Sequence, residues 1–495
     1  MNSNEPPEDS EITFIRTMMA KTEARLVHLG DEISNLRGKL ERLEEERVLL
    51  LHNSRTPTDA ILSPLRRMPP ELIREIFLWT LPSTSDALRL GRVDTSQSPW
   101  LLTHISSRWR AISLSTSSLW SLVAIDYTAS VKTTSTYSVR LVETQLQRAQ
   151  KLHVMFYGST GMNSGPQVQM FQLLSQHSSR WEQLSVGLTS ELAPLLSAVR
   201  DRVPSLRILW IQWTNWEEHA GVQSIDCFQT APCLVDVGLF NIFRFTPVLF
   251  PFHQLTRYET NCPFETHRRV LRQTPNLVEA HINIDFDEIP WPNAAPTIDL
   301  LHLRRLYISN AKALDHLRLP AVEELALPEG PDLLSSFYSL LDRSSCSIRR
   351  LCLIRPMAHT AISILQKIAS ITELLIVHDD DTNEVNSLVA TLSVPSLPGG
   401  TTLAPHLSLL YFGCEEVYFI DYEAYLAMLK SRWEANNCSL KRAALLIIDG
   451  PKPDPVTIAG LHALRREGLD LLLLDSAEAD EEMNGWEYTV SSAGI

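Results

Sequence analysis

Two short stretches carry residue types that could hold a metal ion. His378-Asp379-Asp380-Asp381 joins an imidazole to three carboxylates, and Cys262 stands five residues before His267. Consecutive carboxylates point apart, so we interpret the first stretch as a polar loop after a strand. The second stretch lacks the further ligand pair that zinc needs. The chain also has no P-loop, G-x-G-x-x-G, H-E-x-x-H or G-x-S-x-G motif. We therefore expect no catalytic residue, no cofactor and no metal.

Charged residues follow a second, longer pattern. The spacing apolar-x-x-apolar-x-apolar recurs from about residue 150 onward, in segments that start at 181, 206, 234, 255, 277, 303, 322, 348, 371, 407 and 440. The third residue of seven successive segments alternates in sign: Asp236, Arg257, Glu279, Arg305, Glu324, Arg350 and Glu373. Such residues would be neighbours about 4.8 Å apart on adjacent parallel strands. Opposite charges there stabilise a sheet by a few tenths to about 1 kcal/mol each. We interpret the row as a register device rather than a charged binding site.

The fifth residue of each segment should share a face with the third, because side chains alternate along a strand. This predicts that Trp210, His281, Tyr307 and Tyr411 line one concave surface. Aromatic side chains on such a surface are typical anchors for a protein target. Loops or the C-terminal tail could cover some of them.

The segments themselves predict the architecture that positions these side chains. Helix-like runs separate several segments, such as residues 267–276 and 361–370, and residues 461–475 read as a last helix and strand. A short strand and a helix at this period are the leucine-rich-repeat signature. We expect an irregular β/α solenoid with a parallel sheet over residues 126–475, followed by a solvated acidic tail over 476–495.

Residues 61–125 predict a small helical module. Pro69 and Pro70 are suited to a first helical turn, where missing N–H groups cost nothing. The apolar residues that follow span too wide a face to be buried within about 60 residues, so part of that face should serve a partner. Trp109 and Trp120 belong to two further helical pieces and suit either a core or an interface.

This arrangement resembles the F-box, the adaptor-binding module of cullin–RING ubiquitin ligases, in the form numerous in mushroom-forming fungi. The resemblance covers roughly residues 60–125, and the repeats extend it along most of the chain. The sequence departs from the family in three places. Met68 stands where the family has Leu, and Ile105-Ser106 stands where it has Val-Cys. The link between the first two helices, residues 82–100, is longer than in a minimal F-box. The resemblance implies a three-helix F-box over 58–125. It also implies that adaptor contacts come from Pro69, Leu72, Ile73, Ile76, Phe77 and Trp109.

The N-terminal region predicts a coiled-coil helix over residues 12–53, after a disordered stretch at 1–11. Apolar residues recur at 3–4 spacing from Ile12 to Leu50, and only Thr22 and Arg47 interrupt them. Such a seam needs a partner helix, either in a second copy of the chain or in the chain's own body. Pro57 should end the helix.

Composition narrows the class of protein. A net charge of −14 argues against nucleic-acid binding. No transmembrane helix and no signal peptide are expected. The seven cysteines are scattered without C-x-x-C, which favours reduced, mostly buried thiols in the cytoplasm or nucleus.

Together these features favour an α plus α/β chain that acts as the substrate-recognition subunit of an SCF-type ligase and is not itself an enzyme. Its partners would be a Skp-family adaptor, a cullin held through it, an unknown target protein and, where residues 12–50 pair as a homodimer, a second copy of the chain. The alternatives are a leucine-rich-repeat scaffold with no ligase role, and a hydrolase built on an α/β sheet.

Overall fold

A computed structural model describes most of the chain. It covers residues 9–487 except 63, 90–92, 129–136, 161–163, 214–221, 242–244, 288–295, 369, 379–381, 395–401, 417–420 and 436–437. The chain divides into two compact units, Met1–Ile76 and Phe77–Ile495, which are described separately.

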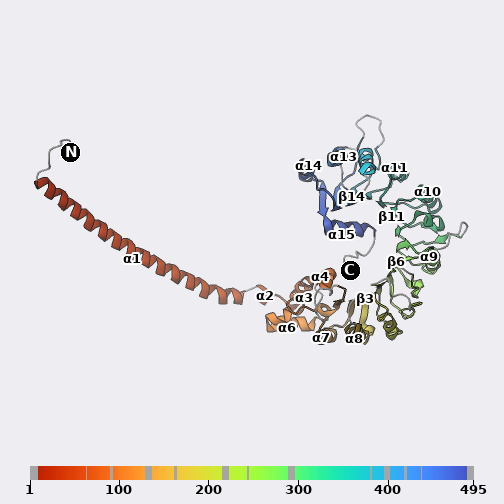
Figure 1. Cartoon of the computed structure of the whole chain (residues 1–495), viewed down its shortest axis with the longest axis horizontal. Coiled ribbons are helices and arrows are strands. Elements are labelled where there is room, and N and C mark those ends of the chain that lie inside the picture. Colours follow the sequence, from red (N-terminus) through yellow and green to blue (C-terminus); the bar gives the residue numbers. More distant parts are fainter. Residues whose placement is uncertain are drawn as a thin grey trace. The chain divides into compact units, whose positions relative to one another are not determined.

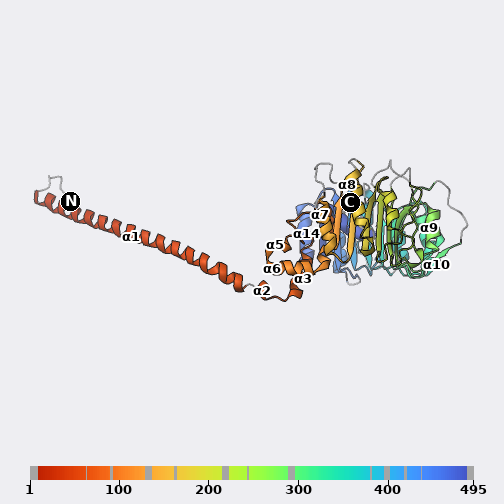
Figure 2. The same cartoon turned by 90° about the horizontal axis from the view of Figure 1, so that it is seen from below.

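The first unit is dominated by one long helix, α1 (Asp9–Leu62), drawn in red in Figures 1 and 2. The prediction of disorder over residues 1–11 is therefore wrong for residues 9–11, which are helical. Residues 1–8 lie outside the described part. The helix also continues five residues beyond Pro57. The prediction that Pro57 ends the helix is therefore wrong: a proline disturbs one turn, through a lost hydrogen bond and a crowded carbonyl, but does not forbid the helix from continuing. The apolar seam is exposed to solvent at Leu26, Ile33 and Leu40.

Short helices follow α1. They are α2 (Pro64–Arg67), α3 (Pro70–Trp79), α4 (Thr84–Arg89), α5 (Leu102–Ile105), α6 (Ser107–Ser115) and a 3₁₀ turn at Ser117–Trp120. Helix α3 begins at the second proline and crosses the division between the two units. Ser106 caps α6, because its hydroxyl accepts a hydrogen bond from the Trp109 N–H.

The second unit is built on one curved parallel sheet of fourteen strands, in which the repeats succeed one another in chain order (Figures 1 and 2). The strands are β1 (Leu122–Asp126), β2 (Leu152–Tyr157), β3 (Trp181–Leu188), β4 (Ile208–Trp213), β5 (Asp236–Phe240), β6 (Arg257–Cys262), β7 (Glu279–Ile284), β9 (Arg305–Ile308), β11 (Glu324–Pro328), β12 (Arg350–Ile354), β13 (Glu373–His378), β14 (Leu409–Glu416), β15 (Arg442–Asp449) and β16 (Asp470–Asp475). A separate pair joins β8 (Ile298–Asp299) to β10 (Leu317–Arg318). Each strand adds to the one before it, as in a solenoid.

Helices and 3₁₀ turns connect the strands on the outer side of the sheet. The helices are α7 (Val139–Arg148), α8 (Ser164–Ser175), α9 (Phe264–Leu271), α10 (Leu333–Ser344), α11 (Ala358–Lys367), α12 (Thr382–Leu392), α13 (Tyr422–Glu434) and α14 (Pro455–Arg466). Other repeats use 3₁₀ turns instead, at Ala193–Val199, Phe252–Gln254 and Ala311–His316. This mixture explains the uneven repeat length.

The core lies between the sheet and these connections. The fourth and sixth residues of each predicted segment, such as Leu209 and Ile211, are buried there. The prediction of a parallel β/α solenoid is thus confirmed. The sheet, however, starts at Leu122, within the range expected for the helical module, and β1 pairs with β2 in parallel.

Candidate binding face of the sheet

The charged row lies on the inner face of the sheet, and its predicted register is confirmed. Each of the seven residues is the direct strand partner of the next one, from Asp236 opposite Arg257 to Arg350 opposite Glu373. Every neighbouring pair forms an ion pair, with N–O distances of 3.4, 2.7, 2.9, 3.4, 3.6 and 3.8 Å along the row. Charge alternation in the sequence therefore becomes a continuous chain of ion pairs.

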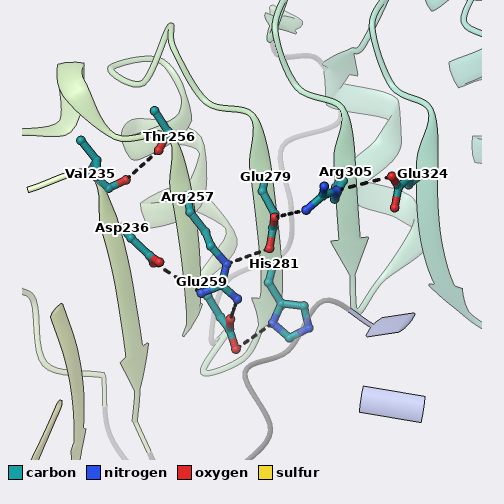
Figure 3. A network of polar contacts seen from close by, with 9 residues as sticks. All are labelled: Val235, Asp236, Thr256, Arg257, Glu259, Glu279, His281, Arg305 and Glu324. Atoms are coloured by element: carbon teal, nitrogen blue, oxygen red, sulfur yellow. Dashed lines mark hydrogen bonds and ion pairs between the residues drawn. The ribbon is translucent and has the colours of Figure 1, made fainter. Parts of the chain in front are cut away.

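Arg257 is the most enclosed member of this row (Figure 3). Its guanidinium lies 2.7 Å from Glu279, 2.8 Å from Glu259 and 3.4 Å from Asp236, and its side chain is only 15% exposed. Burial alone lowers the pKa of Arg257, but the surrounding carboxylates raise it above its usual value. Burial raises the pKa of Asp236, and Arg257 opposes that rise. Arg257 is thus fully paired here, and the carboxylates around it outnumber the cations.

The predicted aromatic row is also in register, but only part of it is open. Trp210 and Tyr307 are half-buried, whereas His281 is buried. The guanidinium of Arg257 lies 5.1 Å from the Trp210 ring centroid, which suits a cation–π contact. His281 stacks on Tyr307 with centroids 3.9 Å apart and pairs with Glu259 at 3.4 Å. Tyr307 also packs against the buried cluster of β11 to β15, so Trp210 is the more accessible aromatic side chain on this part of the face.

The residues after 475 do not form the solvated tail that the acidic composition predicts. Residues 476–487 form helix α15 (Ser476–Glu487), which lies inside the curve of the sheet (Figure 1). Its Ala479, Met483 and Trp486 are buried in a cluster with side chains of β11 to β15. The tail was mispredicted because three apolar side chains on one helix face outweigh the solvation of its acidic face. Residues 488–495 lie outside the described part.

Helix α15 covers Tyr411, the fourth predicted aromatic anchor. The rings of Tyr411 and Trp486 lie 5.2 Å apart, and the Arg350 guanidinium lies 3.9 Å from the Trp486 ring centroid. Burial raises the pKa of Tyr411, and the nearby Glu482 carboxylate raises it further. Tyr411 therefore holds a segment of its own chain in this structure.

A second candidate surface is the exposed stripe on α3. Leu72, Ile76 and Trp79 are 54%, 41% and 88% exposed. Their spacing of four and three residues places them on one helix face. Three neighbouring large apolar side chains on a ten-residue helix are an unusual feature of a water-facing surface.

The other predicted adaptor residues are placed differently. Ile73 and Phe77 are buried, and Phe77 packs against the half-buried Trp109 with ring centroids 4.8 Å apart. Pro69 is exposed just before the helix, and its carbonyl accepts the Ile73 N–H at 3.2 Å. Phe77 and Trp109 therefore support the helix, while Leu72 and Ile76 remain open. Trp79 was absent from the predicted contacts, although it continues the Leu72 and Ile76 spacing.

The pair Cys262 and His267 is a buried structural cluster. His267 Nε2 donates to the Asn283 carbonyl at 3.1 Å, so its Nδ1 accepts from the Tyr258 hydroxyl at 3.2 Å. Burial lowers the pKa of His267 to about 4 and raises that of the Cys262 thiol to about 12. The described residues contain no cluster of three metal-ligating side chains. His378 is buried at the end of β13, and Asp379–Asp381 lie outside the described part.

The fold defines a leucine-rich-repeat-like α/β solenoid with a helical N-terminal region. No protein-family model and no curated protein matches the sequence. Among solved structures, the chain is similar to one in the crystal structure of the TLR13–ssRNA13 complex, at 13% identity and a TM-score of 0.28. That match covers 60% of this chain and 46% of the other, so the chain spans about half its length. A protein from Bacteroides fragilis matches at 10% identity and a TM-score of 0.20, over 67% of each chain.

Likenesses this distant carry no functional argument, and the fold class rests on the strand order and register. Among the described residues, no helix combines the length and apolar character needed to cross a bilayer.

Proposed function

We propose that the chain is the substrate-recognition subunit of a cullin–RING ubiquitin ligase. Helix α3 docks on a Skp-family adaptor, and the inner face of the solenoid binds the target protein. The observation that carries this proposal is the exposed stripe of Leu72, Ile76 and Trp79. An amphipathic helix that presents apolar anchors at this spacing is a recurring way for one polypeptide to bind another. A Skp-family adaptor is the partner that the F-box resemblance of the surrounding sequence implies.

In this proposal the chain is not an enzyme. It holds the target close to a ubiquitin-charged partner in the assembly, and proximity accelerates the transfer. The inner face suits target binding because the half-buried Trp210 ring, held by the Arg257 guanidinium, lies beside a row of ion pairs. Aromatic anchors on a rigid surface lose little conformational entropy on binding.

The long helix α1 adds a second proposed contact. Its seam residues Leu26, Ile33, Leu36, Leu40 and Leu43 are each at least half exposed. A seam with this heptad spacing is stabilised when another helix packs into it. We propose that two copies of the chain pair through residues 12–50, which would give two target sites in one assembly.

The decisive experiment is co-purification of the full chain with the adaptor. The variant Leu72→Asp/Ile76→Asp places two charges in the stripe without touching the buried Ile73 or Phe77. Arg74→Asp is the matched control, because Arg74 is exposed and lies about 160° around the helix from Leu72 at about 100° per residue. We expect wild type and the control to retain the adaptor and the double variant to lose it. Equal retention by all three proteins would refute docking through α3.

A leucine-rich-repeat scaffold without a ligase role is the second candidate. The inner face favours it as strongly as it favours a ligase receptor, because a protein-binding face is common to both. The co-purification experiment distinguishes the two functions, because a scaffold would bind its own partner but would not retain the adaptor.

A further inference from the structure

The inner face changes character along the sheet. The fifth-position residues of β6 to β9 are Glu259, His281 and Tyr307, which are polar or aromatic. In the next strands the same row continues in register as Ala326, Cys352, Leu375, Tyr411 and Ala444. These five side chains are buried although they lie opposite the solenoid core. The C-terminal half of the inner face is therefore a smooth apolar strip that needs a cover.

Helix α15 fits this strip through three side chains on one face. Ala479, Met483 and Trp486 are spaced four and three residues apart, and all three are buried. The Met483 sulfur lies so close to Gly413 that any Cβ at this position would overlap it. Trp486 fits beside Tyr411 and beneath the guanidinium of Arg350. The contact is thus selective for a small residue, a methionine and a tryptophan at these positions.

Arg350 contacts helix α15 while it keeps both ion pairs of its own row. Its ion pairs with Glu324 and Glu373 measure 3.6 and 3.8 Å, the longest in the charged row. Arg257, in the equivalent position of an earlier repeat, holds Glu279 at 2.7 Å. Recognition of Trp486 therefore uses a cation that the alternating row supplies.

A single residue with a strained backbone joins α15 to the solenoid. The helix follows β16 directly, and the joint is Ser476, which has a left-handed φ of 50° that costs a non-glycine residue energy. Asn484 and Gly485 are weak helix formers, and twelve residues are too few for a stable helix in water. Packing on the strip is what keeps α15 helical, so release and unfolding of the segment would occur together.

We propose that the strip on β11 to β15 is the target site and that α15 is a built-in ligand that occupies it. The target is a protein that presents a short helix with a small residue, a methionine and a tryptophan at positions i, i+4 and i+7. This helix displaces α15, whose own outer face is acidic at Glu478 and Glu481. The inference rests on the proposed function in one respect, namely that the inner face binds a target.

The test uses the full chain and a fluorescein-labelled synthetic peptide of residues 474–488 as the probe. Met483→Ala/Trp486→Ala releases the chain's own helix and leaves the strip intact. Glu481→Ala is the matched control, because Glu481 is exposed on the same helix. In fluorescence anisotropy we expect the released variant to bind the peptide at least tenfold more tightly than wild type or the control. A peptide with alanine in place of its tryptophan should not bind.

A third variant locates the site on the strip. Gly413→Val in the released background should abolish peptide binding, because it fills the place of the methionine sulfur. The proposal is overturned if the released variant stays folded by circular dichroism and binds no peptide. It is also overturned if release unfolds the sheet, since α15 would then be a structural cap. Adaptor co-purification of the same variants reports separately on α3, so the two proposals fail independently.

Discussion

Replacing Arg257 with methionine should show how much the charged row contributes to the stability of its repeats. The substitution keeps most of the side-chain volume but leaves Asp236, Glu259 and Glu279 without their shared cation. Breaking a buried pair by removing one partner costs about 3–5 kcal/mol. The two short contacts of Arg257, at 2.7 and 2.8 Å, fall in the range of charge-assisted hydrogen bonds, each with a net value of about 1.5–3 kcal/mol. We therefore expect Arg257→Met to destabilise its repeats by about 3–5 kcal/mol.

Arg442→Met is the matched control for this substitution. Arg442 pairs with Asp470 at 2.6 Å in the same kind of cross-strand position, but its side chain is 52% exposed. Solvent screens such a pair, so its loss should cost about 0.2–1 kcal/mol. The two variants thus compare one chemistry in two environments.

Hydrogen exchange measured by mass spectrometry suits a repeat protein, because it reports the opening free energy of each segment. Exchange of the β5 to β7 peptides in Arg257→Met should accelerate by roughly two to three and a half orders of magnitude, since about 1.4 kcal/mol is tenfold. The destabilisation caused by Arg257→Met should become smaller as the pH falls toward 4, because protonation removes the charge of the carboxylates that have lost Arg257. The reasoning is refuted if both variants lose the same opening free energy, or if the loss in Arg257→Met does not change with pH.

Three further outcomes follow from single features of the structure. Gly238→Val should destabilise the sheet by about 1–3 kcal/mol, because its side chain would overlap the Trp210 ring; thermal unfolding measures this, and an unchanged midpoint would contradict it. His267 has a folded pKa of about 4 against an ordinary 6.5, so its stabilising effect is fully present above pH 6.5 and is lost as the pH falls toward 4. A His267→Gln variant should accordingly show a shallower loss of stability over that window, and parallel curves would argue against it. Leu29→Asp/Leu36→Asp should convert a dimer to a monomer in light scattering, and a wild-type monomer would disprove pairing through α1.

Local patterning was sufficient to predict the solenoid. The predicted strand segments matched because each repeat buries its own fourth and sixth residues, which is a short-range requirement. The charge alternation revealed the register, because the residues at Asp236, Arg257 and Glu279 stand in the same position of successive repeats. The first two strands were missed even though the spacing is present, as in Trp120, Val123 and Ile125. The first of these strands lies in the range that was assigned to the helical module, and the spacing of the second begins with an alanine.

The state of the inner face could not be predicted in the same way. Whether Tyr411 is open depends on Trp486, which lies 75 residues further along the chain and in an acidic segment that reads as solvated. The strip that holds α15 is assembled from single residues of five strands. No pattern within a short stretch of the sequence predicts such a surface. On α3, by contrast, the periodicity identified Leu72 and Ile76 but could not divide the apolar residues into supporting and exposed ones.

The most direct test of the account is hydrogen exchange of the full chain with and without a purified Skp-family adaptor. Docking through the exposed stripe predicts that adaptor slows exchange across residues 70–79 and leaves α15 and the β5 to β7 peptides unchanged. The Leu72→Asp/Ile76→Asp variant should show no such protection. Unchanged exchange over residues 70–79 at saturating adaptor would contradict the central claim that α3 is held open for another polypeptide.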